Sequence, residues 1–182
     1  MKARQLLMAV LPLILACALT GCSDNNKAPD VADSIRKSLD DSGYKDVSVS
    51  QDRDKGVVTL SGNVATPTDK AQAESIAKSG AGAQVVANQI AVRPPGNESD
   101  AKTVDSDLDK AIEKNIDAVL VKNKLSKDLK YDVKNGVVTL KGEVTSQGRR
   151  TQVEKLIATV PNVKQVVNEV EVKGQKASST PS

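Results

Sequence analysis

The chain carries the stretch GVVTLSGNV at residues 56–64 and repeats it as GVVTLKGEV at residues 136–144. A second pair follows the same spacing, because VANQIAV at residues 86–92 returns as VVNEVEV at residues 166–172. The offset is 136 − 56 = 80 residues for the first pair and 166 − 86 = 80 for the second. Two units at so long a period are too few for a solenoid array. The repeat therefore predicts two tandem copies of one small domain.

Each copy begins with a predicted helix and two strands. In the first copy, apolar residues recur every four positions from residue 31 to 39, with Asp30 as the expected N-cap and Gly43 as the expected stop. The second copy shows the same helical pattern from residue 108 to 120. Alternating apolar residues then predict a pair of strands in each copy. The pair Asn135-Gly136 between the strands of the second copy indicates a tight hairpin, because both turn residues need positive φ.

A second helix and a last strand complete each copy. Thr66-Pro67 predicts a capped helix start, with proline in the first turn. The last strands alternate apolar residues at 86–92 and 166–172. The order is α-β-β-α-β, twice, and the fold class is α+β. We expect each copy to be a three-stranded sheet with two helices on one face and water on the other.

This order, with the G-V-V-T-L-x-G-x-V core and the closing V-x-N-x-[IV]-x-V strand, resembles the BON domain. The resemblance covers residues 30–93 and 107–173. The chain is similar to two-domain members of that family, some lipid-anchored in the outer membrane and some soluble in the periplasm. The resemblance implies a small non-enzymatic module associated with phospholipid surfaces and with envelope integrity.

The first 21 residues are typical of a bacterial lipoprotein signal. Lys2 and Arg4 precede an apolar run at residues 6–19, which is shorter than the roughly 20 residues of a membrane span. The run ends in Leu19-Thr20-Gly21-Cys22, which is similar to a lipobox whose cysteine is acylated. We expect a lipidated tether at residues 22–29, anchored in the outer membrane and facing the periplasm. The alternative is an ordinary exported protein with a chance Gly-Cys pair.

The composition excludes several classes of function. The chain has no His, so imidazole-based catalysis and imidazole metal sites are excluded, and its two cysteines are too few for a Cys₄ zinc site. Two Tyr, with no Trp or Phe, give no platform for stacking bases. We expect a non-catalytic protein with no cofactor, no metal site and no nucleic-acid partner.

Positive charge gathers in the second copy. Residues 30–93 hold eight Lys or Arg and nine Asp or Glu, whereas residues 107–173 hold thirteen and ten. Lysines near an anionic bilayer surface contribute about 1 kcal/mol each. The candidate contacts for anionic phospholipid are Lys110, Lys114, Lys122, Lys124, Lys127, Arg149 and Arg150. The alternative for the lysines is a solvated helix face, with Lys110 paired to Glu113 and Lys114 to Asp117.

Three other features carry local expectations. Arg149 and Arg150 begin a predicted helix, where cations oppose the helix dipole. Either an anionic ligand or a pair between Arg150 and Glu154 would compensate. Asn88 and Asn168 point inward, so we expect them to bond nearby backbone. Gly62 and Gly142 predict a bulge or turn.

The remaining segments are polar. Residues 94–106 have the composition of a linker between the copies, and residues 174–182 have that of a disordered tail. Two functions stay open. The first is binding of anionic phospholipid by the second copy, and the second is a protein-interaction or chaperone-like module that binds an envelope protein with a wet sheet face or a domain groove.

Overall fold

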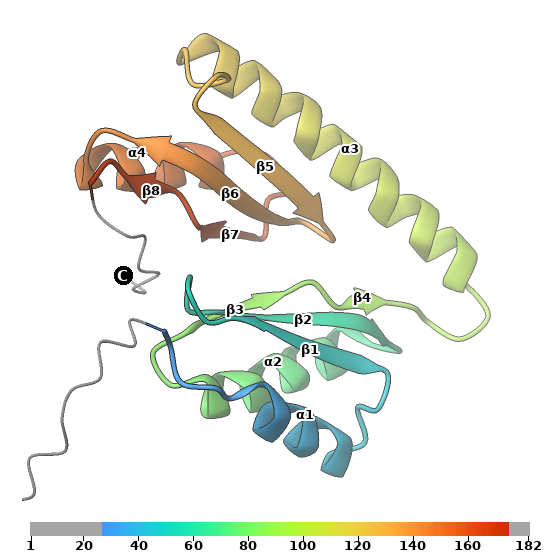
Figure 1. The fold of residues 1–182 in the computed structure, drawn as a ribbon. Coiled ribbons are helices and arrows are strands. Elements are labelled where there is room, and N and C mark those ends of the chain that lie inside the picture. The colour runs from blue at the N-terminus through green and yellow to red at the C-terminus, as the bar shows by residue number, and fades with distance from the viewer. Residues whose placement is uncertain (1–26, 175–182) are drawn as a thin grey trace, which may run out of the picture.

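The computed structural model describes residues 27–174, so the expected signal, Cys22, the start of the tether and residues 175–182 lie outside the described part. The first copy consists of α1 (Ala32–Asp41), β1 (Val47–Asp52), β2 (Val57–Val64), α2 (Pro67–Ala81), β3 (Val85–Asn88) and β4 (Ala91–Val92). The second copy consists of α3 (Glu98–Lys122), β5 (Leu129–Lys134), β6 (Val137–Val144), α4 (Gln147–Ala158), β7 (Gln165–Asn168) and β8 (Glu171–Val172). The predicted α-β-β-α-β order is confirmed twice (Figure 1).

Each copy forms a small mixed sheet around one central strand. In the first copy β2 pairs antiparallel with β1, and its other side pairs parallel with β3 and then with β4. The second copy repeats this arrangement around β6. The predicted last strand is therefore split into two short strands that share one side of the central strand. The parallel pairing requires a crossover, which α2 and α4 provide.

Most of the predicted starts and stops are confirmed. Thr66 and Asp69 form a capping box, in which each side chain accepts a hydrogen bond of 3.1 Å from the other residue's backbone N–H. Asn135 and Gly136 adopt φ values of 51° and 81°, as the hairpin requires. Gly43 follows the end of α1 with a φ of 91°. These local signals succeed because each depends on only a few neighbouring residues.

The expected N-cap at Asp30 is wrong. The N-cap residue of α1 is Val31, whose N–H donates to Oε1 of Gln51 over 3.1 Å. Asp30 instead lies 3.5 Å from the guanidinium of Arg53. A side chain from the neighbouring strand thus satisfies the helix start, and no local capping residue is needed.

The linker expected at residues 94–106 is mostly helical. Helix α3 begins at Glu98, so only a short turn separates it from β4. Glu98 and Asp100 in its first turn suit the positive end of the helix dipole. A half-buried ion pair of 2.5 Å joins Arg93, after β4, to Asp105. The polar composition that indicates a linker belongs to a largely exposed helical extension.

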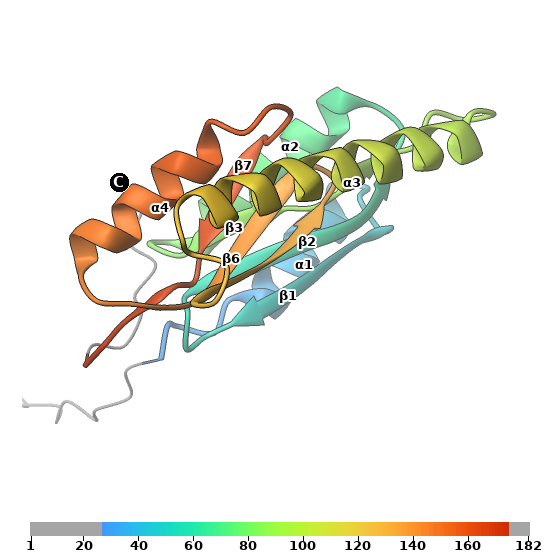
Figure 2. The same ribbon diagram turned by 90° about the horizontal axis from the view of Figure 1, so that it is seen from above.

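The two sheets pack against each other near β3 and β7, so the expectation of a wet outer face is wrong there, while the outer faces of β1 and β5 stay exposed as expected. Val57 and Ala87 of the first copy form one apolar cluster with Val137 and Val167 of the second, and each is at most 2% exposed. Val57 is equivalent to Val137, and Ala87 to Val167, at the same 80-residue offset. The helices lie on the outer sides, giving layers of helices, sheet, sheet and helices (Figures 1 and 2).

Polar contacts add to this shared cluster. Gln165 of β7 accepts a hydrogen bond from the N–H of Asn88 over 3.2 Å and donates one to the carbonyl of Val86 over 2.8 Å. Its side-chain amide therefore occupies the free edge of β3 as a neighbouring strand would. Asn135 donates to the carbonyl of Gln89 over 2.7 Å. These bonds fix the relative position of the copies.

Gly62 and Gly142 lie within the central strands, with φ values of +105° and +124°. A Cβ at Gly142 would come within 2.1 Å of the carbonyl oxygen of Asp128. Both the backbone angle and the close approach require glycine. The equivalent Cβ at Gly62 would meet the carbonyl oxygen of Asp46 at 2.0 Å, so the two copies share this constraint.

Val167→Asp tests the packing between the copies. We expect a loss of about 3 kcal/mol or more in the free energy of unfolding, because the facing copy buries the carboxylate without a partner. Ser48→Asp is the control, since Ser48 is exposed on the outer face of the first sheet. Urea unfolding measures both variants. Equal, small losses would show that the facing copy does not cover Val167.

Gly142→Ala tests the close approach at the central strand. We expect a loss of about 2 kcal/mol or more, from backbone strain and the clash with Asp128. Gly148→Ala is the matched control, because a Cβ at that helical position meets nothing within 4 Å. That variant should be stabilised by up to about 1 kcal/mol. Thermal unfolding compares the two, and a stable Gly142→Ala protein would contradict the expectation.

Candidate functional site

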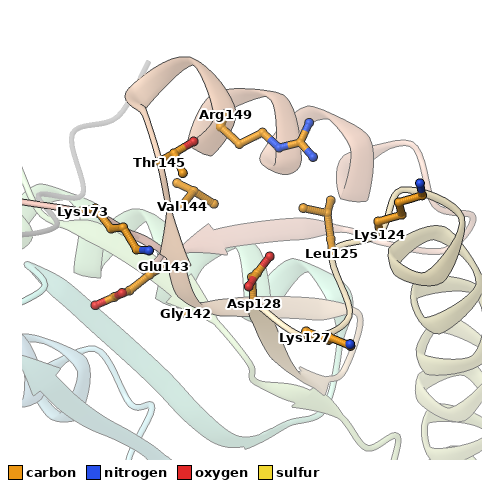
Figure 3. Close-up of a pocket in the computed structure, with 10 residues that line it drawn as sticks. All are labelled: Lys124, Leu125, Lys127, Asp128, Gly142, Glu143, Val144, Thr145, Arg149 and Lys173. Carbon is orange, nitrogen blue, oxygen red and sulfur yellow. The ribbon is translucent and has the colours of Figure 1, made fainter.

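Four cations of the second copy line one open cavity of about 560 Å³ (Figure 3). They are Lys124 and Lys127 from the loop after α3, Arg149 from the first turn of α4, and Lys173 after β8. The cavity also holds Leu125, Asp128, Gly142, Glu143, Val144 and Thr145. Four positive and two negative side chains leave an excess of positive charge. Within residues 27–174 no ion pair joins the four cations to a carboxylate.

Lys124 has an unusual backbone conformation. It follows the C-cap of α3 with a φ of 57°, in the left-handed region that favours glycine. The next N–H, of Leu125, donates to the carbonyl of Leu120 over 2.8 Å and closes the helix in a Schellman motif. In the first copy Tyr44 donates to Leu39 in the same way, and the residue equivalent to Lys124 is Gly43. The second copy thus has a lysine at the position where the first copy has glycine.

Arg149 also departs from the first copy. The hydroxyl of Ser146 caps α4 by accepting from the N–H of Arg149 over 3.2 Å. The equivalent pair in the first copy is Thr66 and Asp69, which form a complete capping box. A cation in the first turn opposes the helix dipole, whereas an acid there is stabilising. The guanidinium of Arg149 donates to the amide oxygen of Gln152 over 3.0 Å.

The other predicted lysines lie outside this cavity. Lys110 pairs with Asp107 at 3.4 Å and not with Glu113, and it borders a separate shallow hollow of about 380 Å³. Lys114 is exposed on α3, and the side chain expected to pair with it, Asp117, instead accepts from the hydroxyl of Tyr131 over 2.6 Å. Lys122 is exposed in the last turn of α3. The structure thus brings together Lys124, Lys127 and Arg149, and leaves these three lysines apart.

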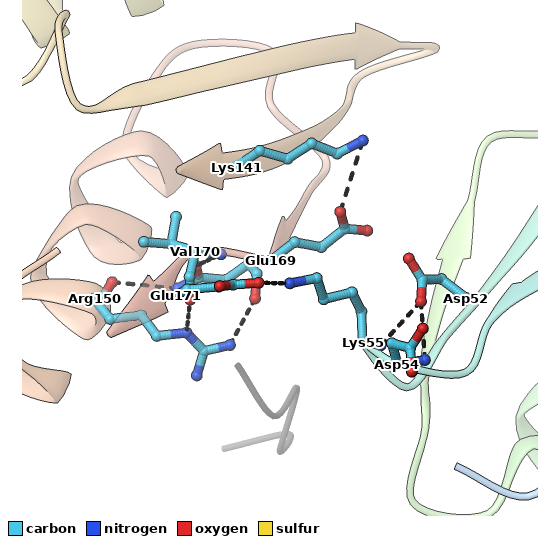
Figure 4. Close-up of polar contacts among 9 residues, drawn as sticks. Asp52, Asp54, Lys55, Lys141, Arg150, Glu169, Val170 and Glu171 are labelled. Carbon is cyan, nitrogen blue, oxygen red and sulfur yellow. Dashed lines mark hydrogen bonds and ion pairs between the residues drawn. The ribbon is translucent and has the colours of Figure 1, made fainter. Parts of the chain in front are cut away.

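Arg150 is buried and does not belong to a surface patch. It is 8% exposed, and its guanidinium donates to the carbonyls of Val170 and Asn168 over 2.9 and 2.6 Å (Figure 4). The expected pair with Glu154 is also wrong, because Glu154 accepts from Asn168 over 2.9 Å. Arg150 satisfies backbone carbonyls where the last strand is interrupted. In the first copy Lys70 does this with one bond of 2.7 Å to Ile90.

The two inward asparagines are structural, as expected. Asn168 donates to the carbonyl of Arg150 over 3.2 Å and accepts from the N–H of Val170 over 3.2 Å. Asn88 makes the equivalent bonds in the first copy, with Lys70 and Ile90. Both therefore hold the break in the last strand against the second helix of their copy.

Electrostatic effects at the boundary between the copies follow from burial. Burial raises the pKa of Glu169, and Asp52 adds to this rise, while Lys141, 3.7 Å away, opposes it (Figure 4). Burial likewise lowers the pKa of Lys70, with Lys164 adding to that effect. Lys55 of the first copy pairs with Glu171 of the second in the same region (Figure 4).

Sequence reasoning missed Lys173. It follows the last strand of the second copy, as Arg93 follows that of the first, so the aligned repeat held a signal for it. Within residues 27–174 no cluster of three or more His, Cys, Asp or Glu side chains suited to a metal ion is found. No helix in the same range combines the length and the apolar character needed to cross a bilayer.

Comparison with known proteins gives one informative relative. The Osmotically-inducible protein Y of Escherichia coli strain K12 is 31% identical over 137 residues, covering 74% of this chain and 67% of that protein. Two structures of CdsD, a structural protein of the type III secretion system of Chlamydia trachomatis, match at 15% identity with TM-scores of 0.29 and 0.30. They cover 78% of this chain, which spans only 65% and 61% of theirs. Scores this low establish no shared fold.

The family comparison covers most of the chain. The BON domain matches residues 23–94 and again residues 108–174, in agreement with the two copies of the structure. BON domains are non-catalytic modules, and the match points to no enzyme family. The double match and the identity to the Osmotically-inducible protein Y show that this chain belongs to the BON domain family.

Proposed function

We propose that this chain is an outer-membrane lipoprotein that binds anionic phospholipid through the cation-lined cavity of its second copy and supports envelope integrity without catalysis. The relation to the Osmotically-inducible protein Y supports a place in the periplasm or envelope. The lipobox-like stretch ending at Cys22 supports a lipid anchor, although it lies outside the described residues.

The proposal rests on two residues of the second copy that differ from their equivalents in the first copy. Lys124 stands where the repeat has glycine at positive φ, and Arg149 stands where it has a capping-box acid. Each departure lowers local stability, and both bring a cation into the same cavity. Residues that oppose local preference concentrate at binding sites, because function and not folding selects them. The favoured ligand is therefore an anion.

The size and mixed charge of the cavity suit a phospholipid headgroup. A volume of about 560 Å³ lies within the range of small-molecule sites and accommodates a phosphodiester with a short polyol. The four cations would hold the phosphate. Asp128 and Glu143 would accept hydrogen bonds from hydroxyl groups on the headgroup. This combination favours phosphatidylglycerol over an isolated phosphate.

The end of α3 beside the cavity suits a membrane surface. Val121 is 65% exposed in the last turn of the helix and is followed by Lys122. An apolar side chain next to lysines matches the boundary between acyl chains and headgroups. Attraction to the charged surface weakens as salt screens it.

The protein-interaction alternative loses part of its surface. It relied on a wet sheet face or a domain groove, and the shared cluster of Val57, Ala87, Val137 and Val167 covers part of both outer faces. No contact of the described residues favours that function over lipid binding.

Lys124→Gly separates stability from binding. We expect the free energy of unfolding to rise by about 0.5–1 kcal/mol, because glycine relieves the left-handed strain. We expect affinity for phosphatidylglycerol vesicles to fall roughly fivefold, at about 1 kcal/mol per lysine. Thermal unfolding and vesicle co-sedimentation measure the two effects on the same protein. Lys78→Ala, on the exposed surface of α2, should leave binding unchanged. A stabilised protein with undiminished binding would count against the cavity.

Arg149→Asp restores the residue of the first copy and is the direct test. With Ser146 it can complete a capping box, so stability should rise by about 0.3–1 kcal/mol. Binding of the soluble chain, with Cys22→Ser, to phosphatidylglycerol vesicles should fall about tenfold or more, because two units of charge are reversed. Lys155→Glu makes the same charge change on α4 outside the cavity. Equal losses in the two variants, or equal binding to neutral vesicles, would refute the proposed site.

A further inference from the structure

The described chain starts at the turn between β1 and β2. Ala28 and Arg53 exchange two hydrogen bonds, one from the N–H of Ala28 to the carbonyl of Arg53 and one from Nε of Arg53 back to the carbonyl of Ala28, each 2.8 Å long. Lys27 lies 3.5 Å from Asp54 of the same turn. Lys27, the first described residue, is thus held at this turn.

The turn lies next to the second copy at the end that holds the cavity. Lys55 of the turn pairs with Glu171 of β8. Glu171 is paired in the sheet with Glu143, which lines the cavity, and lies two residues, roughly 7 Å, before Lys173. Figure 2 shows the same end in outline, with the chain start, the end of β8 and the start of α4 on one side.

The opposite end of the molecule is remote from the β1–β2 turn and from the cavity. Helix α3 has 25 residues and is roughly 37 Å long. Its C-terminal end leads into the cavity loop, whereas its first turn points to the far side (Figures 1 and 2). The chain start, the turn and the cavity thus share one end, and the first turn of α3 marks the other.

The anchor cannot reach far from this end. Five residue steps separate Cys22 from Lys27, which span at most about 17 Å when fully extended. Given lipid binding as proposed above, we propose that the cavity binds headgroups of the same leaflet that holds the lipid on Cys22, with the β1–β2 turn of the first copy resting on that surface. The occupant is an anionic glycerophospholipid of the anchoring membrane, not of a facing one.

The two copies have different parts in this contact. The cations of the turn and of the chain start beside it are paired, with Lys27 beside Asp54, Arg53 beside Asp30, and Lys55 beside Glu171. The cavity cations have no carboxylate within ion-pair distance in residues 27–174. The turn therefore acts as a nearly neutral spacer, and the second copy supplies the attraction. The shared apolar cluster keeps the spacer and the cavity at a fixed separation.

Single tryptophans test this orientation, because the chain has no Trp of its own. Residues 22–182 are coupled through Cys22, the sole thiol of that chain, to a maleimide lipid in vesicles of phosphatidylglycerol and phosphatidylcholine. A nitroxide on the phosphatidylcholine headgroup quenches nearby Trp. We expect Asp54→Trp, in the turn, and Ser126→Trp, between the cavity residues Leu125 and Lys127, to lose most of their emission. Ser99→Trp, at the far end of α3, should keep nearly all of it.

The outcomes separate this proposal from the binding function. If the uncoupled Cys22→Ser chain co-sediments with phosphatidylglycerol vesicles but Ser99→Trp is the quenched probe of the coupled chain, same-leaflet binding is overturned and lipid binding stands. Quenching of no probe in the coupled chain has the same meaning. Equal quenching of Ser126→Trp in vesicles of phosphatidylcholine alone overturns it too, because the tether then acts without the cavity. If the uncoupled chain binds no anionic vesicle, the binding function itself fails.

Discussion

The contact between the two outer sheet faces determines the rest of the molecule. Four small apolar side chains, Val57, Ala87, Val137 and Val167, come from equivalent positions of the two copies and exclude water between the sheets. Because each copy also has its own core on the helix side, the strands that carry these four residues are buried on two faces at this contact, whereas the outer faces of β1 and β5 stay exposed. Two small domains that could have moved independently on a linker are held as one body, and this brings the chain start beside the cavity.

Much of the fold could be predicted from the repeat and from short local signals. The element order, the Asn135-Gly136 hairpin, the Thr66-Pro67 helix start and the structural asparagines depend on near neighbours or on strict alternation. Three cavity residues, Lys124, Lys127 and Arg149, were also identifiable, because charge differs between the aligned copies. The family resemblance is confirmed by the double BON match.

The rest depends on distant partners that the sequence does not display. The pairs Val57-Val58 and Val137-Val138 place apolar residues on both faces of a strand, yet the pattern cannot say what covers the second face. Asp30 is the expected cap of α1, but the N–H of the N-cap residue Val31 donates to the side chain of Gln51, which comes from β1. Arg150 looks like a surface cation but satisfies carbonyls at a strand break that alternation does not reveal. Position in space, and not residue type, distinguishes it from Arg149.

The amide of Gln165 has a consequence for the solubility of the chain. By bonding both Asn88 and Val86 it closes a strand edge that would otherwise be open to any extended peptide. A first copy released from the second would expose this edge together with Val57 and Ala87, a combination prone to self-association. Each copy thus shields the other from self-association, and a first copy separated from the second should be less soluble than the whole chain.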